Sequence, residues 1–403
     1  MKRILPLTCL AALAAFIPSP HESAQAGTWR IGGYTALEAR TFTQDHKWAA
    51  QSDNLDLSLI VTPEFRYKSD DRTHRINFIP YLRANNVDAE RSHGDLREAF
   101  YMYRGDEIEL LAGANKVFWG VTESQHLVNI INQTDLIEDP DQEDYLGQPM
   151  VQIASQRDWG KISAYLMPYF RERTLTGEDG RLRAALPYDT QSNPTYESSA
   201  EEWHTDIALR YSHYIGDFDI GLSYFSGTSR EPTFNITPRG ELRPHYGLIN
   251  QFGLDFQYTT ESWLWKFEAI GREGMGDKFA AAVGGFEYSF YQLFESDLDL
   301  GLLLEYQYDG RDTSKSPITT ANNDIFAAAR LAFNDTQDSE ILAGFTIDHE
   351  TQDSFINLEA ETRLGDNYQI ELRARFIVGA DQGEDLYDFA RDDYIQLRLA
   401  RYF

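Results

Sequence analysis

The amino-acid sequence predicts an all-β protein, a transmembrane antiparallel β-barrel of about 18 strands, with 16 strands as the alternative. Three observations predict it. Apolar and polar residues alternate over segments of about 10 to 14 residues, short and long connections take turns along the chain, and the last segment alternates up to a terminal Phe403. Period-two alternation turns one row of side chains toward lipid and the other toward water.

The closing segment, residues 393–403, shows this pattern clearly. Its apolar face carries Ile395, Leu397 and Leu399, and its polar face carries Gln396 and Arg398. A terminal aromatic residue fits the girdle at the membrane interface and resembles the mark that barrel-assembly machinery reads. Phe403 is therefore predicted to be the assembly signal, with that machinery as a partner during biogenesis.

The connections between the predicted strands fall into two classes. The short ones are rich in Gly, Asp, Asn and Ser and cover residues 68–72, 104–106, 157–158, 215–217, 259–262, 294–297, 334–338 and 365–367. The mostly longer, more polar ones cover residues 44–54, 85–94, 116–148, 171–201, 228–246, 272–277, 310–322, 349–353 and 380–391. This alternation is typical of short periplasmic turns and long extracellular loops.

The polar faces of the predicted strands carry many charges. Segment 368–378 places Gln369, Glu371, Arg373 and Arg375 opposite its apolar row. A small soluble barrel packs its interior, so repeated charge on this face indicates a water-filled lumen. A secreted β-sandwich or β-propeller also alternates, but its strands are usually shorter than these.

The N-terminal residues predict export. Lys2 and Arg3 precede an apolar run, residues 4–17, and Ala24 and Ala26 form a small-x-small cleavage site. We expect a signal peptide over 1–26, one barrel domain over 27–403, and a location in the outer membrane of a Gram-negative bacterium. The single cysteine, Cys9, would leave with the signal.

Composition narrows the partners. The full chain has a net charge of −28, with 36 basic and 64 acidic residues. Removing 1–26 deletes Lys2, Arg3 and Glu22, which leaves 34 basic and 63 acidic residues and a net charge of about −29. Nucleic acid is excluded as a partner, whereas 13% aromatic residues suit girdles in contact with outer-membrane lipid.

Two stretches of the chain resemble a loosely defined group of uncharacterised proteobacterial outer-membrane proteins. The first comprises residues 96–100, the strand and Trp-Gly turn over 110–120, and the Asn-containing segment 128–135; the second runs from residues 284–288 through 297 and 309–311 to the C-terminus. Together they cover about half of the chain that would follow the signal. The resemblance implies a porin-like barrel and no particular substrate.

Charge placement suggests a pore. Lumen-facing charges are predicted on strands near the closure, namely Arg40, Arg66, Arg363, Arg373, Arg375, Arg398, Glu38, Glu64, Glu361 and Glu371. The connection 116–148 carries an amphipathic piece, residues 126–131, and the acidic residues Asp135, Glu138, Asp139, Asp141, Glu143 and Asp144. If it folds inward, its charges face the arginines across a constriction, where a transverse field sorts solutes. Alternatively, these charges only neutralise one another across strands.

The sequence therefore predicts a channel for passive diffusion of small hydrophilic solutes, without enzyme activity, cofactor or metal. A closed structural or lipid-export barrel working with an inner-membrane partner is the alternative. A barrel hydrolase is less favoured: the nucleophile and metalloprotease motifs are missing, and His204, Asp206 and Ser212 on one strand face are a weak substitute. Loose cation binding by the acidic loop and the oligomeric state stay open.

Overall fold

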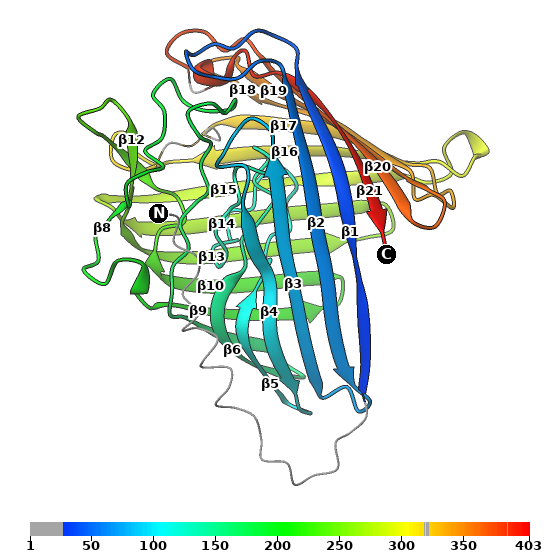
Figure 1. Ribbon diagram of the computed structural model, residues 1–403. Helices are drawn as coiled ribbons and strands as arrows, with labels where there is room; N and C mark the ends of the chain where they lie inside the picture. Colours follow the sequence, from blue (N-terminus) through cyan, green and yellow to red (C-terminus); the bar gives the residue numbers. More distant parts are fainter. Residues whose placement is uncertain (1–26, 318, 320–321, 385) are drawn as a thin grey trace.

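A computed structural model describes residues 27–317, 319, 322–384 and 386–403. They form an 18-stranded sheet in which every neighbouring pair is antiparallel and β1 (Gly27–Phe42) closes onto β21 (Tyr394–Tyr402). Figure 1 shows these two strands side by side at the seam. The predicted barrel and its strand number are confirmed, and the expected signal peptide lies outside the described residues.

The remaining barrel strands follow one another around the wall in chain order. They are β2 (Leu55–Ser69), β3 (His74–Asn85), β4 (Gly94–Arg104), β5 (Ile108–Asn115), β6 (Gln148–Arg157), β7 (Gly160–Met167), β9 (Asp206–Ile215), β10 (Phe218–Thr228), β13 (Leu248–Thr259), β14 (Trp263–Gly274), β15 (Asp277–Phe290), β16 (Asp299–Asp309), β17 (Asp324–Ala332), β18 (Glu340–Asp348), β19 (Ser354–Leu364) and β20 (Tyr368–Val378).

Smaller elements lie in the connections. A three-stranded sheet combines β8 (Thr195–Tyr196), β11 (Thr233–Ile236) and β12 (Leu242–Tyr246). Short 3₁₀ turns occupy η2 (Glu201–Trp203), η3 (Leu293–Glu295) and η4 (Tyr387–Phe389). No helix in the described part of the chain is long and apolar enough to cross a membrane.

One predicted loop is wrong. Residues 272–277 were predicted to be one of the mostly longer, more polar connections. Instead, β14 continues to Gly274 and β15 begins at Asp277. Met275 and Gly276 have φ angles of 54° and 82°. Two successive positive φ values match a tight hairpin turn, so the polar residues around it belong to the strands.

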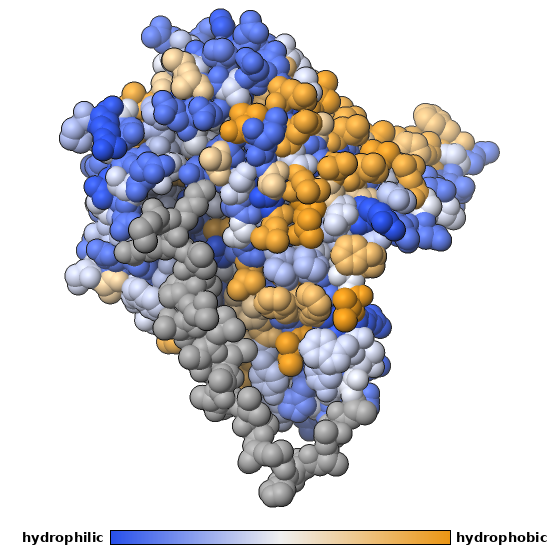
Figure 2. Space-filling view, in the orientation of Figure 1, coloured by the Kyte–Doolittle hydropathy of each residue, from blue (hydrophilic) through white to orange (hydrophobic). Residues whose placement is uncertain are grey.

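The outer wall of the barrel is apolar. Large hydrophobic side chains alternate outward along the strands and stay exposed, among them Leu37, Leu57, Phe252, Leu302 and Leu397. Figure 2 shows hydrophobic residues gathered over the wall near β1, β2, β20 and β21, with hydrophilic residues over the loops. An exposed apolar band around a closed sheet is stable only against lipid, so this is a transmembrane barrel of the outer-membrane type.

The main hydrophobic core lies inside the barrel. The connection between β5 and β6, residues 116–147 and hereafter the inward loop, inserts its apolar residues into the lumen. It contributes Trp119, Leu127, Val128, Ile130 and Ile131 to a cluster with the inner faces of β4 to β7, β9, β10 and β13 to β15. Val128 and Ile131 are fully buried. Burial of about five such side chains contributes several kcal/mol to holding the loop inside.

Candidate functional site

The inward loop reaches opposite walls of the lumen. Near its start, Thr122 and Ser124 hydrogen-bond to side chains of β14 and β16. Farther along, Glu138 and Asp139 bind arginines of β3 and of β20. These two sets of contacts hold the loop across the lumen.

Asp139 lies at the centre of the contact with β20. Its carboxylate oxygens are 3.1 Å from Arg373 Nη1 and 3.3 Å from Arg375 Nη2. The Tyr394 hydroxyl donates to the same carboxylate at 3.2 Å, and Asp141 adds a contact of 3.0 Å to Arg375. Burial alone would raise the pKa of Asp139, but the neighbouring arginine charges lower it to about 2.

A second contact joins the loop to β1 and β3. Arg83 lies between two carboxylates, 2.7 Å from Glu38 Oε1 and 2.5 Å from Glu138 Oε2. Arg40 Nη2 donates to the backbone carbonyl of Glu138 at 2.9 Å. All these side chains are buried. Buried ion pairs of this kind hold the inward loop against the wall, because breaking one of them leaves a buried charge without a partner.

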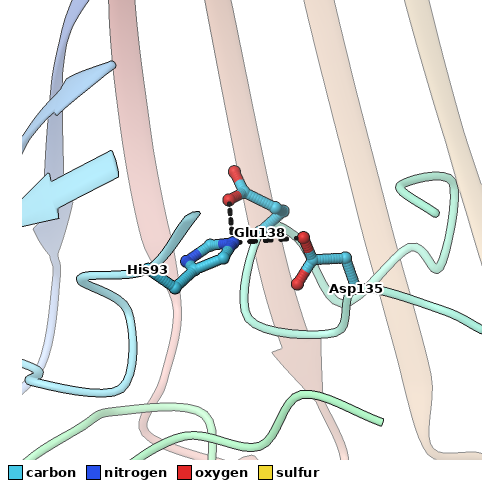
Figure 3. Close-up of side chains that lie close together, drawn as sticks. All are labelled: His93, Asp135 and Glu138. Atoms are coloured by element: carbon cyan, nitrogen blue, oxygen red, sulfur yellow. Dashed lines mark hydrogen bonds and ion pairs between the residues drawn. The ribbon is translucent and has the colours of Figure 1, made fainter. Parts of the chain in front are cut away.

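His93 completes this contact from the loop between β3 and β4 (Figure 3). Its Nε2 lies 3.2 Å from Asp135 Oδ2 and 3.4 Å from Glu138 Oε1. Its Nδ1 lies 3.1 Å from the carbonyl oxygen of Arg91. Because both ring nitrogens face hydrogen-bond acceptors, this arrangement favours the doubly protonated imidazolium over the neutral ring.

His93, Asp135 and Glu138 are residues of the kinds that bind metal ions, and their ligand atoms lie close together. However, protein donors already serve all four carboxylate oxygens. Asp135 accepts from Thr174, His93 and Arg97, and Glu138 accepts from Tyr81 and Arg83. With these positive charges beside it, the cluster is a hydrogen-bond network that attaches the inward loop.

The pKa of His93 gives a testable pH dependence. Burial lowers this pKa, but Asp135 and Glu138 raise it above the ordinary 6.5 overall. The stabilisation is therefore complete below pH 6.5 and is lost as the pH rises through the raised pKa. As the pH rises above 6.5 we therefore expect barrel stability to fall by an amount that depends on His93. Urea midpoints of the native chain and of His93→Asn check this; an equal fall in both contradicts it.

All the predicted pore-lining residues except Glu361 fall into three groups. Arg40, Arg373 and Arg375 contact the acidic segment of the inward loop. Glu38 binds Arg83 and Arg91, and Glu371 binds Arg398 on the wall itself. Arg66 and Arg363 lie near the short turns, pair with Glu64 and Asp338, and have more than half of their side chains exposed.

The remaining predicted residues have other neighbours. Glu361 is exposed and accepts from Gln369. Glu143 contacts His126 within the loop at 2.9 Å. Burial and the nearby Glu138 raise the pKa of Asp144 to about 6.

Three arginines of this site, Arg83, Arg91 and Arg97, were not predicted from the sequence. Arg83 occupies a lumen-facing position of β3, which alternation could have identified. Arg91 lies in a connection and binds Glu38 and Asp56, and no local pattern marks it. Arg97 is the extra residue of a β-bulge, since Ile79 pairs with Glu98 and Pro80 with Leu96. The bulge changes which residues of β4 face the lumen, so simple alternation does not predict the direction of the Arg97 side chain.

The residues of the possible hydrolase site, His204, Asp206 and Ser212, make contacts that account for them structurally. His204 Nδ1 lies 2.9 Å from Asp206 Oδ1, but Asp206 is fully buried and also binds Arg230 at 2.7 Å. Ser212 lies further along β9, opposite Lys161 and Gly221. Asp206 thus holds the end of β10, where it accepts from the backbone N–H of Thr228, and it binds Arg230 in the connection that follows.

Comparison with known proteins extends the fold assignment. No family model matches the sequence, and no curated protein matches it. Among solved structures, Wzi of Escherichia coli, described as a carbohydrate-binding β-barrel involved in group 1 capsule assembly, is similar with a TM-score of 0.53 and 11% identity over 99% of this chain and 89% of that one.

Two Pseudomonas proteins are similar over most of their length. OpdQ of Pseudomonas aeruginosa has a TM-score of 0.52 and 11% identity over 94% of this chain and 97% of its own. A BenF-like porin of Pseudomonas fluorescens has a TM-score of 0.51 and 9% identity over 94% and 98%. At these identities the likeness concerns the fold, which is that of an outer-membrane β-barrel.

Proposed function

We propose that this barrel is an outer-membrane channel for passive diffusion of small hydrophilic solutes, narrowed by the inward loop. The observation that carries the proposal is the placement of a charged loop across a lumen whose wall is itself charged. Such a constriction sets both the size limit and the charge preference of a channel.

The wall from β17 to β20 is the side on which we place the passage. Charged side chains there stay in contact with water, with exposed fractions of 27% for Arg330 and Arg373, 35% for Glu359 and 43% for Glu340. A small cavity lies at Glu359, Glu361, Glu371 and Arg373. The apolar cluster fills the opposite part of the lumen. A hydrated solute therefore finds polar partners along β17 to β20.

The loop and this wall carry opposite charges at the narrow point. Asp139 and Asp141 face Arg373 and Arg375. Because these charges are paired in direct contact, they fix a strong local field at the edge of the remaining opening, and this field orients water and polar solutes. Because Arg373 is partly exposed and Arg375 is buried, Arg373 is the residue that a passing ion would encounter.

Charge reversal at Arg373 tests the proposal. Arg373→Glu should shift the reversal potential under a salt gradient toward cation preference, because a local potential of a few kT changes ion occupancy severalfold. Arg363→Glu is the matched control, since it makes the same charge change near a turn. Equal shifts in both variants would place the selective point away from the loop.

A closed barrel is the second candidate, favoured by the buried apolar cluster inside the lumen. The likeness to Wzi, described as carbohydrate-binding, fits a barrel that presents its extracellular loops to a ligand. We favour the channel because the β17 to β20 wall is charged and exposed to water, and we favour it over a hydrolase because Asp206 is already bound by Arg230.

A further inference from the structure

Two glutamates of the barrel wall have an unusual set of partners. Glu268 on β14 is fully buried, and Glu305 on β16 is 2% exposed. Within the described residues, neither has a lysine or arginine nitrogen close enough for an ion pair. A buried carboxylate without a counter-charge is costly unless several donors hold it.

The inward loop supplies those donors. Glu268 accepts from the backbone N–H groups of Val121, Thr122 and Val128 at 2.7, 3.1 and 3.0 Å, and from the Thr122 hydroxyl at 2.8 Å. Two parts of the loop, residues 121–122 and residue 128, thus converge on one carboxylate. A single side chain satisfies three backbone donors that would otherwise be buried and unpaired.

Glu305 repeats the arrangement two strands away. It accepts from the backbone N–H groups of Glu123 and Ser124 at 2.9 and 2.8 Å, and from the Ser124 hydroxyl at 2.6 Å. Residues 121–124 therefore give all four of their backbone N–H groups to two wall carboxylates. Successive N–H groups pointing at one charge form a nest, which favours a full negative charge over a neutral acceptor.

From these contacts we infer that Glu268 and Glu305 are the positioning residues that hold the first half of the inward loop in place. The apolar cluster favours burial of this segment in general, but it is not directional. The two carboxylates fix its register by binding particular N–H groups. This inference deepens the proposed channel, because the position of the loop decides how much of the lumen stays open.

The release of this segment would also change the charge of the lumen. Every described partner of the two carboxylates belongs to the loop. If the segment leaves, both carboxylates pass into lumen water on the two strands that flank β15. The acidic half of the loop has several arginine partners and would stay attached. Within residues 121–128, Glu123 also pairs with Arg330 and Lys266 of the wall. This segment still has fewer ion pairs to the wall than the acidic half, so it is the end of the loop that is released more readily.

Cysteine labelling tests the inference without any need for channel activity. The only cysteine of the chain, Cys9, is in the expected signal peptide, and the side chain of Val128 is fully buried. In a Val128→Cys background we expect maleimide labelling of the folded barrel to be slow. Adding Glu268→Ala and Glu305→Ala should speed it by about tenfold or more, because several N–H groups lose their acceptor.

Matched variants separate the outcomes. Glu109→Ala removes a wall glutamate held by Arg104 and Lys161 and should leave labelling slow. Thr122→Val with Ser124→Ala removes only hydroxyl donors and should speed labelling by a smaller factor. If the double alanine variant fails to fold, Glu305→Ala alone provides the comparison. Labelling that stays slow in folded Glu305→Ala and in the double variant would overturn the inference.

Conductance of the same variants distinguishes this inference from the proposed function. Faster labelling with higher conductance supports both. Faster labelling with unchanged conductance supports the positioning role and contradicts a constriction by this loop.

Discussion

Replacing residues 135–144 of the inward loop by an Asn-Gly turn is expected to raise single-channel conductance severalfold. The structure allows this change because Thr134 and Tyr145 already pair as an antiparallel bridge, so a two-residue hairpin turn can join them. The replacement removes the acidic side chains that cross the lumen, and a constriction dominates the resistance of a channel.

The same replacement should shift the channel toward anions. It removes the contacts that residues 135–144 make with Arg40, Arg83, Arg97, Arg373 and Arg375 and opens these arginines to lumen water. Reversal potentials under a salt gradient measure the shift, and heat-modifiability of the barrel confirms folding. An unchanged conductance in the folded variant would place the constriction in another loop.

The second large effect concerns stability. Asp139→Ala should lower the free energy of unfolding by about 3 kcal/mol, the lower end for breaking a buried pair, because Arg373 keeps some contact with water. Arg375, whose side chain is only 2% exposed, loses one carboxylate but keeps Asp141 and Glu359, which also places the loss at the lower end. A urea titration followed by tryptophan fluorescence measures this difference.

An exposed ion pair provides the control for Asp139. Arg363 and Asp338 lie 2.9 Å apart, with 59% and 66% of their side chains exposed. Asp338→Ala should therefore change stability by less than about 1 kcal/mol. If both variants lose the same small amount, the contact between Asp139 and the arginines does not hold the loop.

The sequence was sufficient to predict the architecture because each barrel strand has its own local alternation of apolar and polar residues. Alternation along residues 368–378 and 393–403 identified β20 and β21, and the order of short and long connections led to the strand number. The turn at Met275 and Gly276 was missed because the surrounding polar residues resemble a loop and the turn lacks an Asn-Gly or Asp-Gly pair.

The contacts of the inward loop could be predicted only in part. Arg373 and Arg375 were recognised because they alternate on β20, and the loop was recognised by its acidic residues. Arg91, His93, Glu268 and Glu305 were not recognised. Their contacts join residues far apart in the chain, and barrel closure and strand register decide which of them meet. A bulge at Arg97 shifts the pairing of β3 with β4 by one residue, and this shift turns the Arg97 side chain to the lumen face.

Single-channel recording of the purified, folded barrel in planar lipid bilayers tests most directly whether ions cross the barrel beside the inward loop. We expect discrete conductance steps from the native chain and larger steps from the variant with the Asn-Gly turn. Steps from that variant alone would show that the native lumen is closed. A folded barrel that conducts in neither form would contradict the proposal that this protein is a channel.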